Sequence, residues 1–110
     1  MASSKGYLDF ILDQLSALNG ISYRQMMGEY ILYYQGKIAA YICDDRLLVK
    51  PVPSAVALMK QPVWERPYEA AKEMLLVEEV DDRAFLTELF EAMLNELPDP
   101  PKKKKKAKDL

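Results

Sequence analysis

Apolar residues recur at helical spacing near the start of the chain. In residues 3–18 they fall three and four positions apart, at Tyr7, Leu8, Ile11, Leu15 and Leu18, which is typical of an amphipathic helix. Most of the polar residues lie elsewhere around the helix, at Lys5, Asp9, Asp13 and Gln14. Serines precede the run and are suited to cap a helix. An Asn-Gly pair follows it, and both residues accept the left-handed conformation that ends helices.

The next segment is dominated by β-branched and aromatic residues. They form four runs separated by short turns, at residues 21–27, 29–35, 37–43 and 47–50. Tight turns between such runs predict an antiparallel meander. The central runs are apolar on both faces, whereas a strand that is wet on one side alternates more clearly. We therefore expect helices to cover one face, and the other face to be partly shielded or used as an interface.

The second half of the chain is predicted to hold two more helices and one more strand. Residues 54–60 predict a short helix capped by Ser54, and residues 61–72 a structured loop anchored by Trp64. A strand is expected over residues 73–78. The helix over residues 81–98 has a continuous apolar stripe of Phe85, Leu86, Leu89, Phe90, Met93, Leu94 and Leu97.

These elements predict an α+β fold in which an antiparallel β-meander is flanked by helices, in the order α-β-β-β-β-α-β-α. A chain of 110 residues that is 50% apolar is the size of one domain and can bury a core without disulfides or metals. We expect residues 1–98 to form that domain. Residues 99–110 are expected to form a disordered lysine-rich tail, because the lysines repel one another and bury nothing.

The residue types that most catalytic and metal sites need are scarce. The chain has no histidine, one cysteine and four glycines. It therefore lacks imidazole-dependent triads, multi-cysteine zinc sites and phosphate-binding glycine loops. Cys43 is interpreted as a small apolar strand residue, and the adjacent acids as turn and helix-start residues. We predict no catalytic, metal or cofactor-binding residue, no cofactor and no enzymatic activity, although carboxylate or lysine chemistry stays an open alternative.

The charge is distributed unevenly. Residues 1–101 carry nine basic and sixteen acidic side chains, whereas residues 102–110 carry six lysines and one aspartate. An acidic body repels a phosphate backbone, so nucleic-acid binding has to come from the tail or a local patch. The tail could equally bind an anionic membrane or an acidic partner, or only improve solubility. The candidate nucleic-acid contacts are Lys102, Lys103, Lys104, Lys105, Lys106 and Lys108.

The lengths of the apolar runs bear on whether the chain crosses a membrane or is secreted. Residues 38–43 are the longest unbroken apolar run, far shorter than the ~20 residues that span a bilayer. Asp9 and Asp13 interrupt the first apolar segment, so no signal peptide is expected. With a single cysteine, which suits a reducing compartment, the sequence predicts a cytoplasmic protein without a membrane span.

Tyrosines are concentrated in the predicted sheet. An aromatic platform for single-stranded nucleic acid would have the same residues, but it would also interleave basic ones. Here the interleaved residues are mainly Leu, Ile, Ala and Glu, so packing across strands is favoured. The tyrosines are Tyr23, Tyr30, Tyr33, Tyr34 and Tyr41.

The stretch MMGEYILYYQGK, residues 26–37, followed by IAAYICDDRLLVK, resembles the TfoX/Sxy N-terminal domain family. The motif positions are Met26, Gly28, Tyr30, Tyr33, Gly36 and Lys50. Glu29 stands where the family often has a second glycine. The resemblance covers about residues 3–97 and implies an α+β domain without catalytic residues. We predict that the motif residues are structural, with Gly28 forming a bend or bulge between the first two strands.

The resemblance also implies a function. Full-length regulators of this family are linked to natural competence and transcription and carry a second, helical domain, for which this chain has no room. We therefore expect a non-catalytic regulatory domain that binds a protein partner or self-associates. The alternative is a nucleic-acid-associated protein that binds non-specifically through the tail.

The tail alternative makes a direct prediction about salt and truncation. Binding by a lysine run should be sequence-independent and should weaken steeply as salt rises, because it depends on counterion release. A chain that ends at residue 100 should lose this binding, measured by fluorescence anisotropy of a labelled DNA duplex. Unchanged binding by the truncated chain, or none by the full chain at low salt, would contradict the tail hypothesis.

Overall fold

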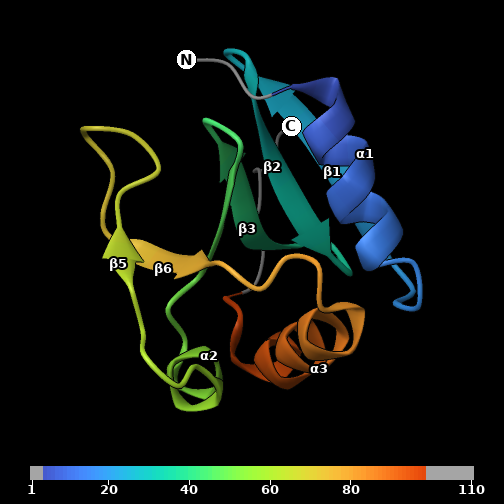
Figure 1. Cartoon of the computed structure of the whole chain (residues 1–110), viewed down its shortest axis with the longest axis vertical. Helices are drawn as coiled ribbons and strands as arrows, with labels where there is room; N and C mark the ends of the chain where they lie inside the picture. The colour runs from blue at the N-terminus through green and yellow to red at the C-terminus, as the bar shows by residue number, and fades with distance from the viewer. Residues whose placement is uncertain (1–3, 99–110) are drawn as a thin grey trace, which may run out of the picture.

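The structure, a computed structural model, describes residues 4–98 as helices packed on one antiparallel sheet (Figure 1). In chain order the elements are α1 (Lys5–Gln14), β1 (Ile21–Met26), β2 (Glu29–Tyr34), β3 (Lys37–Cys43), β4 (Arg46–Val49), α2 (Pro53–Leu58), β5 (Trp64–Glu65), β6 (Met74–Val77), α3 (Arg83–Met93) and the 3-10 turn η1 (Leu94–Glu96). The strands lie in the order β1-β2-β3-β4-β6-β5. The predicted α+β class and meander are confirmed; the tail lies outside the described residues.

Three two-residue turns join the first four strands. The turn residues have positive φ in every case: Met27 (55°) and Gly28 (84°), Gln35 (51°) and Gly36 (83°), and Asp44 (56°) and Asp45 (53°). Two consecutive left-handed residues define the type I′ turn, whose twist matches that of the strands it joins. Gly28 thus lies in a hairpin turn, and the register of β1 against β2 runs unbroken from Ile21–Tyr34 to Met26–Glu29. The register shift of the meander lies instead between β2 and β3, at Leu32 and Tyr33.

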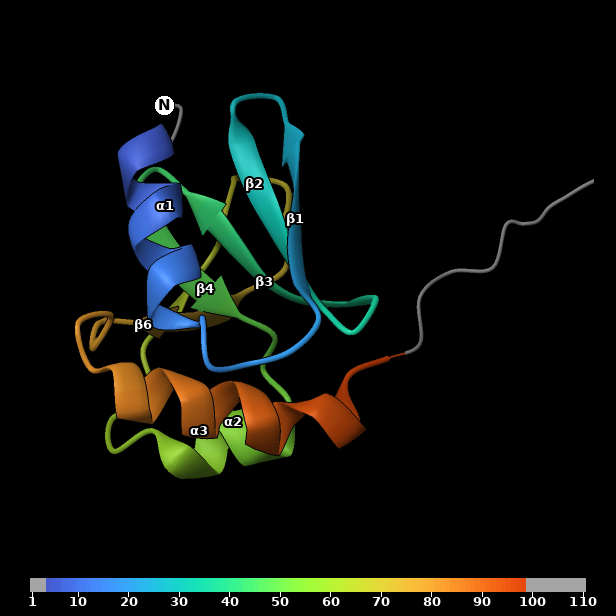
Figure 2. The ribbon, with the colours of Figure 1, turned by 90° about the vertical axis from the view of Figure 1, so that its right-hand side faces the viewer.

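Helices α1 and α3 cover one face of the sheet, and α2 packs against α3 (Figure 2). The sheet contributes the residues of one alternation to this core, including Tyr30, Leu32, Tyr34, Ile42, Leu47, Val49, Leu75 and Val77. The helices contribute Leu8, Ile11, Leu15, Leu86, Leu89, Phe90 and Met93, all fully buried. Because these residues sit at helical and strand periods, the amphipathic pattern accounts for the main core.

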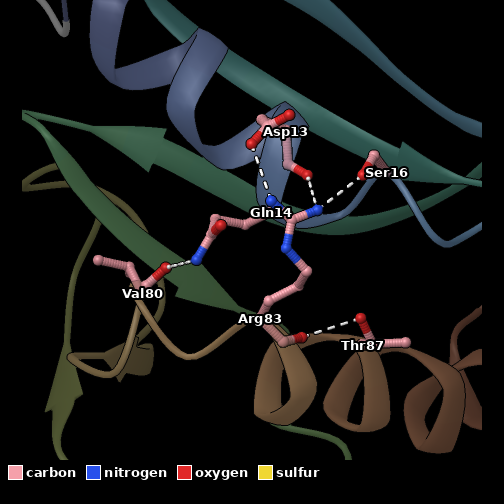
Figure 3. Close-up of polar contacts among 6 residues, drawn as sticks. All are labelled: Asp13, Gln14, Ser16, Val80, Arg83 and Thr87. Atoms are coloured by element: carbon pink, nitrogen blue, oxygen red, sulfur yellow. Dashed lines mark hydrogen bonds and ion pairs between the residues drawn. The ribbon is translucent and has the colours of Figure 1, made fainter.

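Polar contacts join α1 to the segment that leads into α3 (Figure 3). The Gln14 side-chain amide donates to the Val80 carbonyl at 2.9 Å, and Gln14 is 7% exposed. Arg83 donates to the Asp13 carbonyl, the Asp13 carboxylate and the Ser16 hydroxyl, each at 2.9 Å. The expectation that Gln14 belongs to the polar face is therefore wrong, because its partner comes from a distant part of the chain.

The segment between β4 and β6 differs from the prediction in several details. Residues 61–72 contain the short strand β5, in which Trp64 pairs with Leu75, and the Trp64 ring is 45% exposed. The backbone pairing of the strand attaches this segment to the sheet. Helix α2 begins one residue earlier than predicted, at Pro53, because proline suits the first helical position. Ser54 caps nothing; its hydroxyl and amide donate to the Glu96 carboxylate at 2.8 Å each.

The left-handed backbone at Gly28 predicts a large effect of a β-branched residue. A Gly28→Val chain should melt several degrees lower, since valine strains a φ of 84° and each kcal/mol shifts a domain of this size by roughly 4–8 °C. Gly6→Ala is the matched control: Gly6 lies in α1 with nothing within 4 Å of an added Cβ, so melting should stay level or rise. Equal melting temperatures of the Gly28→Val and native chains, measured by circular dichroism, would contradict this role.

Candidate functional site

A hollow of about 430 Å³ opens on the sheet face opposite α1, at the end of the sheet that holds the first and third turns. Strands β1 to β3 supply most of its lining, and the loop between β5 and β6 supplies one aromatic residue. Figure 1 shows that loop on the other side of the sheet from α1. The lining residues are Met26, Met27, Glu29, Tyr30, Ile31, Tyr41, Cys43 and Tyr68.

Exposed apolar surface is concentrated around this hollow. Met27 is 96% exposed at the tip of the first hairpin, and Met26 and Tyr68 are 48% and 56% exposed. Ile31 and Tyr41 are cross-strand partners on the floor, since antiparallel strands place opposed residues on the same face. An apolar patch bordered by polar groups is typical of an interaction site, and methionine side chains adapt to partners of different shape.

Acidic residues lie beside the hollow. The Glu29 carboxylate accepts a hydrogen bond from the Asp44 amide at 3.1 Å, which joins the first and third turns. The Asp45 carboxylate accepts from the Ser4 amide at 2.8 Å, at the start of α1. Glu29 therefore lines the hollow and Asp44 acts on Cys43 in its floor, whereas the Asp45 carboxylate is held at the start of α1.

Arg46 holds the loop that carries Tyr68. Its guanidinium forms an ion pair with Glu65 and donates to the carbonyl oxygens of Arg66 and Pro67, each at 3.4 Å. It also donates to the Cys43 carbonyl at 3.2 Å. The loop is closed by a hydrogen bond from the Ala71 amide to the Tyr68 carbonyl at 3.0 Å. A single side chain thus connects the floor of the hollow to the loop beside it.

Cys43 lies at the bottom of the hollow and is 2% exposed. Burial, followed by the negative charges of Glu29 and Asp44, raises the pKa of its thiol to about 11, although Arg46 acts in the opposite direction. The thiolate is the nucleophilic form of cysteine. The thiol is therefore protonated at neutral pH and suits an apolar floor better than a reaction. Burial likewise raises the pKa of Tyr41, and the Lys50 ammonium lies 5.8 Å from the centre of its ring.

The structure brings some of the motif residues together and separates others. Met26 and Tyr30 line the hollow, and Gly28 forms the turn beside them. Tyr33 is half-buried further along β2, and Gly36 lies in the turn at the other end of that strand. Lys50 follows β4, where its amide donates to the Ala39 carbonyl at 3.0 Å. Their predicted structural role stays a prediction, and the tail lysines lie outside the described residues.

The sequence pattern did not identify Tyr68 as part of a site. It lies in a segment without apolar periodicity, and the contacts that place it are carbonyl groups of the backbone. The only local signal is an aromatic residue directly after Pro67 in an otherwise polar loop. Within residues 4–98, no three histidine, cysteine, aspartate or glutamate side chains are grouped so as to hold a metal ion. In the same range, no helix is long and apolar enough to cross a membrane.

Comparison with known proteins gives one family and one relative. The family described as the TfoX N-terminal domain matches residues 13–88, which contain the meander and most of α3. An uncharacterised 12.7 kDa protein in the trpE 5′ region of Spirochaeta aurantia is 30% identical over 109 residues. That match covers 98% of this chain and 95% of the relative. No solved structure matches the chain.

The protonated, buried thiol predicts low reactivity. In the folded protein at about pH 8, Cys43 should react far more slowly with a disulfide reagent than in denaturant, because little thiolate forms below a pKa of about 11. A Cys43→Ser, Met27→Cys chain is the control, because its only thiol lies at the exposed hairpin tip and should react rapidly. Equally rapid labelling of Cys43 in the native chain would show that the thiol is accessible and ionised.

Proposed function

The chain belongs to the TfoX N-terminal domain family, and from this premise we propose that it is a non-catalytic, regulatory protein-interaction domain. The observation that carries the proposal is the apolar hollow between the first hairpin and the Tyr68 loop. Single exposed apolar residues are common on protein surfaces, but here three of the most exposed ones border one concave site. The absence of histidine from the sequence and the protonated state of Cys43 also favour binding over catalysis.

The chemistry around the hollow indicates the kind of partner. Glu29 lines the hollow and Asp44 lies close enough to act on Cys43, and residues 1–101 carry sixteen acidic against nine basic side chains. Electrostatic complementarity therefore favours a basic partner segment. The floor of Ile31, Tyr41 and Cys43 favours an apolar anchor residue on that segment. We propose a protein partner with both features, met in the cytoplasm, where a lone reduced cysteine is stable.

Nucleic-acid association through the lysine tail is the second candidate. It is favoured by the six lysines in residues 102–110, and it does not involve the hollow. The two candidates are separable, because loss of the tail should leave a partner bound at the hollow in place, whereas it should remove non-specific nucleic-acid binding.

Site-specific photo-crosslinking in living cells tests the proposed partner site. A benzophenone amino acid placed at Met27 or at Tyr68 should give the same discrete protein adduct, identified by mass spectrometry. The matched control position is Glu88, which is exposed on α3, away from the hollow. Asp44→Lys should reduce the adduct several-fold, because a basic partner is then repelled.

Three results would contradict the proposal. The first is the absence of an adduct at positions 27 and 68. The second is a pattern at those positions identical to that at position 88. The third is an adduct at position 68 made only of two copies of this chain, which would replace an external partner by self-association at the hollow.

A further inference from the structure

Strand β1 forms an open edge of the sheet. It has six residues, pairs only with β2 within residues 4–98, and keeps one continuous register over its whole length. Five of its six side chains are exposed. It contains no proline, no lysine and no bulge, which are the devices that usually block an edge strand. Figure 2 shows β1 as the outermost strand on its side, without a helix beyond it.

The geometry of the hairpin turn between β1 and β2 determines which backbone groups of β1 point away from β2. In a two-residue hairpin the flanking residues, here Met26 and Glu29, form a hydrogen-bonded pair. Every second residue of β1 then faces β2, and the bond from the Gln35 amide to the Gly20 carbonyl, at 2.8 Å, continues this alternation. The amides and carbonyls that point away from β2 therefore belong to Ile21, Tyr23 and Gln25.

An apolar groove runs beside this edge. A second hollow, of about 450 Å³, lies between β1 and the end of α1, and it is lined by Leu12, Leu15, Ser16, Leu18, Ile21, Ser22 and Tyr23. Ile21 and Tyr23 project to the same face as α1, because they are opposite the core residues Tyr34 and Leu32. A strand added to β1 would place every second side chain over this groove.

We propose that the added strand is β1 of a second copy of this chain, paired antiparallel with Tyr23 of one copy opposite Tyr23 of the other. The two Tyr23 residues then exchange backbone hydrogen bonds on the two-fold axis, and each Ile21 does so with the Gln25 of the partner copy. In this register all outward-facing groups of both strands are satisfied, and addition of a strand to an edge in this way is an established mode of recognition.

Full pairing of Ile21, Tyr23 and Gln25 within the two strands favours this register, because each neighbouring register of the same backbone parity pairs one of these residues outside β1. Arg24 is the one charged residue of the strand, and with Tyr23 on the axis it faces Ser22 of the partner copy. The next register with the same backbone parity puts Arg24 directly opposite Arg24, which is unfavourable. The acidic bodies of two copies repel each other, but β1 has no carboxylate, so close approach is least unfavourable here. This interface adjoins the partner site proposed above at Met26, which ends β1 and lines the hollow, but the Tyr68 side of that site lies outside it.

A charge-exchange experiment at the axis tests both the interface and its register. The native chain should sediment as a concentration-dependent dimer. Tyr23→Glu and Tyr23→Lys should each raise the dimer dissociation constant at least about tenfold, because like charges then face each other across the axis. An equimolar mixture of the two variants should recover the dimer as a mixed pair. Trp64→Glu is the matched control, because Trp64 is equally exposed at 45% and lies on the opposite edge; it should leave the dimer unchanged.

Circular dichroism should show that all variants fold, since Tyr23 lies on an edge strand and is 45% exposed. A native chain that stays monomeric up to about 1 mM would overturn the proposal. So would a dimer that both Tyr23 variants leave intact, and so would a dimer that they dissociate but their mixture does not restore. Photo-adducts at Tyr68 do not depend on β1 pairing, so either proposal can fail without the other.

Discussion

The three left-handed turns of the meander are the constraint on which the rest of the structure depends. Each confines two residues to positive φ, and four of the six turn residues are not glycine. Side chains in this region cost about 1 kcal/mol each, a cost that burial of the strands offsets. Because a shift of one residue would move every side chain to the other face, the turns decide which residues reach the core. They also bring Met27, Asp44 and Asp45 to the same end of the sheet.

The two faces of the sheet are stabilised by different means. One is covered by α1 and α3, whose apolar stripes bury whole side chains. The other is covered in part by a loop without regular structure, which Arg46 holds through carbonyl groups and Glu65. Helices packed on a sheet exclude water along their length, whereas a loop held at a few polar points leaves gaps. The hollow beside Tyr68 is such a gap, so it follows from the scarcity of helices on that face.

Periodicity predicted the helices, the meander and the core, because those features depend on residues that are close in sequence. The pattern at Leu8, Ile11 and Leu15 needs only the helical repeat, and residues 29–43 need only strand alternation and turn residues. Features that depend on distant partners were missed. Gln14 is buried by Val80, and Ser54 binds Glu96, so neither role is visible locally. The candidate site was not predicted: Met26 and Tyr30 were predicted only as structural residues of a recognisable motif, and Tyr68 is positioned by Arg46.

The opposite edge of the sheet differs from β1 in a way that affects how many copies could assemble. Strand β5 has two residues and lies between Pro62 and Pro67, and proline cannot donate to a ladder. A sheet grows into a fibril only if each added copy offers a second open edge to the next one. A chain that can pair through one edge alone stops at a pair of copies. The short, proline-flanked β5 edge therefore opposes the growth of cross-β polymers from this aromatic-rich sheet.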